Sequence, residues 1–539
     1  MSLKVRIFRS DKSCLLLVLA LALPLLSTGL GDRDLWAPDE PRTGEVTREI
    51  LRSGSWAVLH DNGGVYVEKP PLFFWLAAAA ARAAGRVSEF ALRLPSSLAG
   101  ILGAIALFYL GRGLFGRRVG ALAAVVLLTS QDYFMEARWA HPDMLWTLLL
   151  TCACLAFHEA HASSGGRAWL LAFYLAMGLA VLTKGPAGAI LPILAVLIFL
   201  AASRDLAFLR RAGIAWGLPL SLLPSGLWLL AYRASSGSPF PAAEALVRFA
   251  SRVTQGVHHA HPFPHVLTGL AIEFLPWIVL LPSAVWVTFP RRRERRDRDN
   301  VYLYSWVLAV FSVFAVSAEK RGVYLLPLLP LLSLLVARLW DMALLDWDPS
   351  PVGPLVAWPL VVGLAITAGA TAIVVPRLGR DLPELRQPAA VLAGSLALTI
   401  GVALWVHRRL GGGAALATFA GGLAACYLVI ALLILPVLDR SKSARQFCGR
   451  IAALVGASPL GIYPDPHDAY AFYTGRRVEV LQSREALRAF LESAPRAYCL
   501  MEEEQYEVER RALGRPLRVL DRDRVGHRAM VLVSGVSSP

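Results

Sequence analysis

The sequence is poor in charged residues, cysteine pairs and cleavage signals. Only 17% of its 539 residues are Asp, Glu, Lys or Arg, whereas soluble domains average ~25%. The six cysteines form no CxxC pair and no metal-ligand spacing. No A-x-A-like cleavage site follows the first apolar run, so we interpret that run as a retained helix and not as a signal peptide. The charge deficit argues against a disordered chain and against a soluble enzyme.

Hydrophobic residues are abundant instead, at 56% of the chain. They occur in long runs, which indicates that the solvent around the fold is a lipid bilayer. The net charge of +15 would favour nucleic-acid binding in a soluble protein. In a polytopic membrane protein, Lys and Arg on cytoplasmic loops explain it more simply, so we expect no nucleic-acid partner.

Thirteen apolar runs have roughly the length that a bilayer requires. The predicted transmembrane helices cover residues 14–30, 91–111, 119–135, 143–160, 168–183, 185–202, 212–232, 266–289, 301–318, 322–337, 355–376, 388–407 and 414–437. With the N-terminus in the cytoplasm, the inside loops hold 20 Lys and Arg and the short outside loops hold 7. The arginine cluster 291–298 is interpreted as a topology anchor, with a lipid-headgroup or nucleic-acid site as the alternative.

This topology places three long segments outside the cytoplasm, namely 31–90, 233–265 and 438–539. The tail 438–539 is predicted to be a small α/β domain, and residues 1–437 form the transmembrane domain. Strands are expected at 460–463, 478–481, 497–501 and 530–533, and a helix at 483–492. Cys448 and Cys499 either pair in an oxidising compartment or stay separate buried thiols. The fold class is therefore a mostly α polytopic membrane protein.

The first outside loop opens with two adjacent carboxylates, Asp39 and Glu40. Pro41 favours a helix start, and acidic residues are favourable in a first helical turn in any case. A carboxylate pair at the membrane surface can also orient an acceptor, bind a cation or act as a base. Spacing alone does not distinguish a helix N-terminus from a functional carboxylate pair.

The same loop continues through Lys69 into an apolar run, 71–85, that is too short to span a bilayer. Such a run is typical of an interfacial or re-entrant helix. Lys69 would then lie at the depth of lipid phosphates, or would simply extend its ammonium group to the interface.

Further ionisable residues occur at predicted outside helix ends. Asp143 begins one span, Lys184 lies between two short spans, and Glu319-Lys320-Arg321 precedes Tyr324. Charges near membrane segments are costly, which favours a functional role over a helix cap or anchor when several share one face.

The 233–265 loop adds a stripe of Glu244, Arg248 and Arg252 at helical spacing. Arginine forks recognise phosphate, although a solvated charged stripe has the same pattern. His258, His259 and His261 follow, and with a nearby carboxylate they could bind a metal.

Several segments together resemble the lipid A aminoarabinose transferases of bacteria, which are GT-C glycosyltransferases like the protein O-mannosyltransferases. These are Trp36-Ala37-Pro38-Asp39-Glu40-Pro41-Arg42, Tyr66-Val67-Glu68-Lys69-Pro70, Leu182-Thr183-Lys184-Gly185 and the run from Ser317 to Pro327. The resemblance covers nearly the whole chain. It departs from the family pattern at Val67 and at Lys320-Arg321-Gly322.

The resemblance implies transfer of a sugar from a polyprenyl-phosphate carrier, such as undecaprenyl phosphate, to an acceptor outside the bacterial inner membrane. The acceptor would be lipid A, another glycan or a protein. The implied catalytic residues are Asp39, Asp143 and Glu40, and the implied phosphate- or substrate-binding residues are Tyr66, Lys69, Lys184, Arg248, Arg252 and Tyr324. Glu68 and His259 match family positions linked to a divalent ion, Zn²⁺ or Mg²⁺, without a catalytic role.

Other classes are less consistent with the sequence. A protein O-mannosyltransferase or a surface-polysaccharide transferase would differ in its acceptor pocket. A transporter usually has repeated halves and mid-membrane binding sites. The chain shows no such repeat, and its ionisable residues gather at one predicted face.

Overall fold

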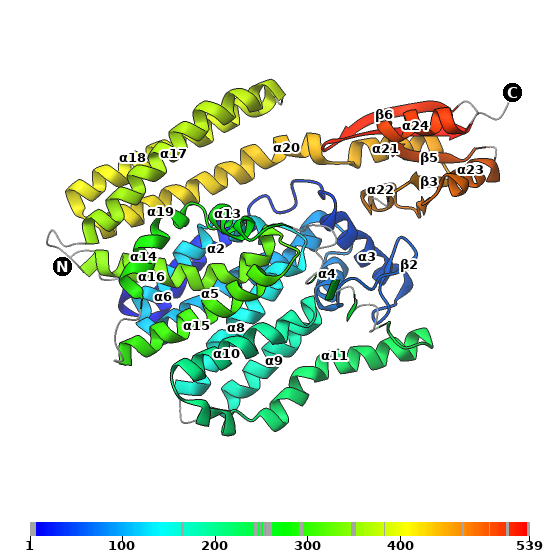
Figure 1. Cartoon of the computed structure of the whole chain (residues 1–539). Coiled ribbons are helices and arrows are strands. Elements are labelled where there is room, and N and C mark those ends of the chain that lie inside the picture. The colour runs from blue at the N-terminus through cyan, green and yellow to red at the C-terminus, as the bar shows by residue number, and fades with distance from the viewer. Residues whose placement is uncertain are drawn as a thin grey trace. The chain divides into compact units, whose positions relative to one another are not determined.

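The computed structural model describes the whole chain except 1–6, 163–165, 242–245, 248–249, 252–253, 255–260, 290–294, 346–351, 382, 466–467, 495, 514–516 and 536–539. Most of the described chain is helical, and the strands β3 to β7 all lie in its C-terminal part (Figure 1). Two compact units can be distinguished. The first comprises Met1–Leu30, Val67–Phe73 and Arg93–Ile434, and the second comprises Gly31–Tyr66, Phe74–Leu92 and Leu435–Pro539.

Long apolar helices make up nearly all of the first unit and enclose one large hydrophobic core. Several of them contain proline, which membrane helices tolerate because neighbouring groups satisfy the freed backbone. Helices up to residue 434 are α2 (Asp11–Ser27), α3 (Asp39–Ser53), α4 (Leu72–Ala83), α5 (Glu89–Phe115), α6 (Arg117–Leu128), α7 (Gln131–Glu136), α8 (Pro142–Ala162), α9 (Arg167–Lys184), α10 (Ala187–Ala202), α11 (Ile214–Ser236), α13 (Pro264–Glu273), α14 (Leu281–Thr288), α15 (Arg295–Val316), α16 (Leu329–Leu345), α17 (Val352–Asp381), α18 (Arg386–Leu410) and α19 (Gly412–Val429). Shorter turns of helix are η1 (Ile7–Arg9), η2 (Leu206–Arg210), η3 (Trp277–Leu280), η4 (Gly322–Leu328), η5 (Pro383–Leu385) and η6 (Ile430–Ile434).

A multi-pass membrane protein is confirmed. Within the described ranges, eight helices are long and apolar enough to cross a membrane, or nine if a bent pair of 264–273 and 277–288 is one span. The predicted span 119–135 is divided between α6 and α7. The short helix expected in the run 71–85 is present as α4. The total of thirteen spans remains a prediction.

The C-terminal part of the second unit is the expected small α/β domain. Its strands β3 (Leu460–Tyr463), β4 (Glu479–Val480), β5 (Tyr498–Glu502), β6 (Leu517–Val525) and β7 (Arg528–Gly535) form one sheet in the order β4-β3-β5-β7-β6. Strands β4, β3 and β5 are parallel, whereas β5, β7 and β6 are antiparallel. The helices of this part are α20 (Leu435–Lys442), α21 (Arg445–Val455), α22 (Asp468–Thr474), α23 (Arg484–Ser493) and α24 (Glu503–Ala512).

The two faces of this sheet decide the state of its cysteines. Successive side chains of a strand point to opposite faces, so Leu500 joins one hydrophobic cluster while Cys499 and Met501 join another. Cys448 belongs to the cluster of Leu500. Cys448 and Cys499 are accordingly two free, buried thiols, which is the second of the two alternatives.

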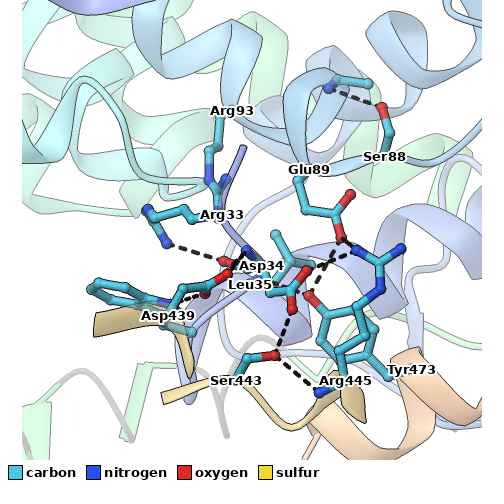
Figure 2. A network of polar contacts seen from close by, with 12 residues as sticks. Arg33, Asp34, Leu35, Ser88, Glu89, Arg93, Asp439, Ser443, Arg445 and Tyr473 are labelled. Carbon is cyan, nitrogen blue, oxygen red and sulfur yellow. Dashed lines mark hydrogen bonds and ion pairs between the residues drawn. The ribbon is translucent and has the colours of Figure 1, made fainter. Parts of the chain in front are cut away.

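Polar contacts within the second unit hold the segment that leads into α3. The backbone N–H of Asp34 donates to both carboxylate oxygens of Asp439, at 3.0 and 3.1 Å. The Asp34 carboxylate accepts from the Ser443 hydroxyl and from the Arg445 guanidinium, each at 2.7 Å (Figure 2). Arg445 also pairs with Glu89 at 3.2 Å. Residues from three separate parts of the sequence therefore position the beginning of α3.

Candidate functional site

An ion pair between Asp143 and Lys184 forms the centre of the candidate site in the first unit. Pro142 opens α8, which puts Asp143 in the first helical turn, and Lys184 is the last residue of α9. Both placements match the helix dipole, which favours acids at the N-terminus and bases at the C-terminus. The Asp143 side chain is 1% exposed, so this carboxylate depends on its partners for stabilisation.

His141 provides a second cationic partner for Asp143. Its Nδ1 lies 2.5 Å from Oδ2 of Asp143 and 3.5 Å from Oε2 of Glu136. Burial lowers the pKa of His141, but the carboxylates of Asp143 and Glu136 outweigh burial and raise it to about 9. His141 is therefore protonated at neutral pH, and Asp143 is compensated by two cations.

Two aromatic rings face the ammonium group of Lys184. Nζ lies 4.8 Å from the ring centre of Trp146 and 4.7 Å from that of Tyr324, distances at which a cation is attracted to a ring. The Tyr324 hydroxyl donates to the buried Glu319 carboxylate at 3.0 Å. The indole N–H of Trp146 is buried and has no hydrogen-bond partner within the described chain.

Lys69 belongs to the same unit, in the segment Val67–Phe73 directly before and into α4. Its charge acts on His141 and lowers the pKa of that imidazole, in opposition to Asp143. The residues Lys69, Asp143, Lys184 and Tyr324 are therefore brought together, although they come from four different segments.

A narrow cleft lies beside Tyr324. Its lining combines the apolar residues Val266, Phe314 and Leu325 with the cations Lys320 and Arg321. At Gly322 an added Cβ would lie 1.7 Å from Oε1 of Glu273, so a side chain cannot be accommodated there without displacing Glu273.

The carboxylates of the first outside loop belong to the second unit. Asp39 and Glu40 form the first turn of α3, which begins two residues before the start expected at Pro41. Glu40 is fully buried and accepts two hydrogen bonds from the Arg33 guanidinium, at 2.6 and 3.2 Å. Asp39 is half-buried. Tyr66 packs edge-on against Phe74 at 5.4 Å, within a hydrophobic cluster of the same unit.

Three of the expected site residues, Arg248, Arg252 and His259, lie outside the described residues. Glu68, the other expected metal ligand, is exposed. The described residues contain no group of three His, Cys, Asp or Glu that could hold a metal ion. Because His259 lies outside the described residues, the implied divalent-ion site stays a prediction.

Reasoning from the sequence did not identify Glu136, His141 and Trp146 as site residues. A signal for Trp146 exists, because it is three residues after Asp143 and therefore on the same helical face. Glu136 ends α7 and His141 lies in the turn before α8, where spacing gives no comparable indication.

Comparison with known proteins gives consistent matches. Residues 68–225 match the family of dolichyl-phosphate-mannose-protein mannosyltransferases. The chain is 33% identical over 319 residues to the undecaprenyl phosphate-alpha-4-amino-4-deoxy-L-arabinose arabinosyl transferase of Edwardsiella ictaluri, covering 57% of this chain and 56% of the relative. It is 31% identical over 386 residues to the enzyme of the same name from Pectobacterium carotovorum, covering 70% of this chain and 67% of the relative. The match to the first of these relatives thus spans just over half of that protein's length.

Solved structures extend the likeness to nearly the full chain. The crystal structure of ArnT from Cupriavidus metallidurans bound to undecaprenyl phosphate superposes with a TM-score of 0.81, at 25% identity, covering 97% of this chain and 98% of that one. The archaeal oligosaccharyltransferase AglB from Archaeoglobus fulgidus shares the fold, with a TM-score of 0.51 at 14% identity, covering 92% of this chain and 69% of that one. The chain belongs to the aminoarabinose transferase-like family of GT-C membrane glycosyltransferases.

Proposed function

We propose that this protein transfers a sugar from undecaprenyl phosphate to an envelope glycolipid, with lipid A as the principal acceptor and aminoarabinose as the sugar. The observation that carries this proposal is the cluster of Lys69, Lys184 and Tyr324 in the first unit, next to a cleft lined by both apolar and cationic residues. The relatives named as arabinosyl transferases and the similar structure with bound undecaprenyl phosphate support the same donor.

The donor has two chemically different parts, and the site offers a partner for each. A polyprenyl tail needs apolar surface, and the half-buried Phe314 beside Tyr324 is its proposed contact. The phosphate needs cations, and Lys69 is the first of these, with the hydroxyl of Tyr324 as a neutral donor. Lys184 is the second cation, held in place by Asp143. Arg248 and Arg252 are proposed as further phosphate ligands by the family match.

In the proposed reaction an acceptor oxygen attacks the anomeric carbon of the sugar. The bond from this carbon to the phosphate oxygen breaks, and the electron pair stays on the phosphate. Negative charge therefore increases on the phosphate in the transition state, so that the surrounding cations lower the barrier electrostatically. No oxidant or reductant is needed.

The acceptor determines whether a base is required. A hydroxyl must lose its proton, and Asp39 is the proposed general base, with Asp143 as the second candidate. A phosphate of lipid A is already an anion and needs no base, and Asp39 would then only position it. Glu40 is assigned a structural role because both of its carboxylate oxygens accept from Arg33.

The proposed location is the bacterial inner membrane, with the site on the periplasmic face. The excess of Lys and Arg in the loops assigned to the cytoplasm supports this orientation. A reporter that is active only in the periplasm, fused after residue 539, should be active. Activity of a cytoplasm-only reporter at the same position would refute the assigned face for every site residue.

The decisive experiment is a transfer assay with purified protein. Undecaprenyl phosphate carrying 4-amino-4-deoxy-L-arabinose is supplied with lipid A, and the product is identified by mass spectrometry. We expect lipid A that is heavier by one aminoarabinose, and no product with Lys69→Ala. If the protein is folded and the donor intact but no modified lipid A forms, the proposed donor–acceptor pair is refuted.

A protein O-mannosyltransferase is the second candidate, because residues 68–225 match that family. The same assay separates the two functions when a mannosyl donor and a Ser/Thr-rich peptide replace the sugar donor and lipid A. Mannosylated peptide together with unmodified lipid A would favour this second function.

A further inference from the structure

The second unit contains a polar hollow of about 230 Å³ that the proposed reaction does not use. One wall is the C-terminal half of α3, with Glu45, Arg48, Glu49 and Arg52. The opposite side is formed by Gly63 and Arg477. The volume is below the roughly 300–1,000 Å³ of pockets that enclose drug-sized ligands, which indicates a small polar ligand group.

The tip of a β-hairpin fixes the geometry of the hollow. The hairpin pairs β1 (His60–Asp61) with β2 (Gly64–Val65). The side-chain amide of Asn62 donates to the carbonyl of Val478 at 2.6 Å and accepts from its N–H at 2.9 Å. The N–H of Gly63 donates to Oε1 of Glu49 at 2.6 Å. These contacts connect α3, the hairpin and the residue after Arg477.

Gly63 allows Arg477 to lie directly over the hairpin tip. A Cβ at Gly63 would lie 3.1 Å from Nε and 3.2 Å from Cζ of Arg477, and the backbone φ there is +79°. A side chain would be strained in this conformation and would push the guanidinium away. The arginine is thus placed at the hollow by the local backbone, although its side chain is exposed.

The hydrogen-bonding groups of the hollow are incompletely used. Glu45 is 1% exposed, and Arg48 donates to its Oε1 at 2.7 Å, but its Oε2 has no partner within the described residues. The Nε of Arg48 is also buried without a partner in that part of the chain. Burial raises the pKa of Glu45 to about 7, although the neighbouring Arg48 lowers it. Buried polar atoms left unsatisfied are costly, which indicates that a ligand or solvent group completes them.

Two further guanidinium groups are uncommitted. Arg52 and Arg477 line the hollow, and neither has an ion pair or a side-chain hydrogen bond to any residue that the structure describes. Arginine presents a planar fork of donors that matches phosphate oxygens. Three arginines around one small hollow are therefore suited to an anion with several oxygens.

We propose that this hollow, formed by Glu45, Arg48, Arg52 and Arg477, binds the phosphorylated sugar of a glycolipid headgroup or of a free sugar phosphate. The phosphate lies between Arg52 and Arg477, and a sugar hydroxyl donates to the free oxygen of Glu45. Inorganic phosphate is disfavoured, because it carries no sugar hydroxyl to reach the Glu45 carboxylate while it lies between Arg52 and Arg477. The hollow shares no residue with the Lys69 cluster, and this proposal does not depend on the proposed transfer reaction.

Binding to full-length protein in detergent tests this site by calorimetry, with glucose 1-phosphate, glucose and inorganic phosphate as probes. The Lys69→Ala background removes one of the ligands proposed for the donor phosphate and so weakens binding at that site. We expect glucose 1-phosphate to bind at least 10-fold more tightly than either of the other probes. Arg477→Ala should weaken glucose 1-phosphate binding about 10- to 100-fold. The protein should stay folded, because this side chain is exposed. Arg511→Ala removes an exposed arginine of the same unit that does not line the hollow and should leave binding unchanged.

A parallel arm uses nanodiscs that contain lipid A or its dephosphorylated form. Arginine-dependent binding in the lipid arm alone assigns a membrane glycolipid headgroup, and such binding in the soluble arm alone assigns a free sugar phosphate. Glu45→Gln should weaken binding of glucose 1-phosphate and leave binding of inorganic phosphate unchanged. Equal affinity for glucose 1-phosphate and inorganic phosphate, or an affinity that Arg477→Ala does not change in either arm, overturns the proposal.

Discussion

Lys184 and Asp143 form an ion pair although they are 41 residues apart and end and begin two different helices. The carboxylate of this pair is almost fully buried, and the ammonium group also faces the ring of Tyr324. A donor phosphate that approaches Lys184 must share this cation with Asp143. The pair therefore sets the position of the ammonium group before the donor arrives.

Removal of one member of this pair should destabilise the protein. Lys184→Met leaves the buried Asp143 with His141 as its remaining cation, and loss of one partner of a buried pair costs about 3–5 kcal/mol. The double variant Asp143→Asn/Lys184→Met should recover part of that loss, because no uncompensated charge remains. Unfolding in detergent measures both. If the loss of stability in the double variant equals the sum of the losses in the two single variants, the two residues do not interact.

Lys69→Ala should reduce transfer by about 10- to 100-fold, since a charge-assisted contact to phosphate contributes roughly 1.5–3 kcal/mol. The protein should remain folded, because Lys69 is only half-buried. Turnover is measured with purified enzyme at saturating acceptor. Lys12→Ala, an exposed lysine of the same unit, serves as the matched control. Near-normal turnover of Lys69→Ala would exclude the phosphate-binding role.

Asp39→Asn distinguishes a hydroxyl acceptor from a phosphate acceptor. If Asp39 is a general base, turnover should fall by on the order of 10²–10⁴, and the wild-type rate should decrease as pH falls through the carboxylate pKa. If the acceptor is a phosphate, the loss should be smaller and the acidic limb absent. A pH–rate profile of both proteins decides this. Full activity of the variant at every pH would leave Asp143 as the better candidate.

Glu40→Gln tests whether this carboxylate supports the fold or the chemistry. Arg33 and Glu40 are 5% and 0% exposed, so removing the carboxylate charge should destabilise the protein by about 3–5 kcal/mol. Glu492→Gln breaks an exposed pair with Arg488 and should change stability by about 0–1 kcal/mol. Thermal unfolding checks both. Unchanged stability of Glu40→Gln with lost turnover would instead support a catalytic role.

His141 should make stability depend on pH in the alkaline range. Its pKa is about 9 in the folded protein and about 6.5 when unfolded. Protonated His141 therefore contributes its full stabilisation below pH ~6.5. That contribution is lost as pH rises through about 9. As pH is raised between these values, the unfolding temperature of the wild type should fall, and that of His141→Gln should change less. His527→Gln, at an exposed histidine, should follow the wild type, and a similar pH slope in His141→Gln would contradict the assignment.

Much of the architecture follows from local sequence. The apolar runs at 91–111 and 143–160 correspond to α5 and α8, because a helix is the way an isolated segment satisfies its backbone in lipid. Ser483 begins α23 as expected, and its hydroxyl accepts from the N–H of Ala486 at 3.1 Å. The strand 460–463 coincides with β3. By contrast, β6 was not expected, since its charged residues suit an edge strand that only the sheet order reveals.

The sequence by itself determined the membrane class, most of the long helices, the C-terminal α/β domain and the residue types suited to a phosphate site. Only the tertiary structure decided their partners. It paired Lys184 with Asp143, placed the Tyr324 ring against Lys184, and separated Cys448 from Cys499 on two faces of a sheet. The physical reason is range: helix formation and capping depend on neighbours within a few residues, whereas an ion pair or a shared cleft depends on packing between segments far apart in the chain.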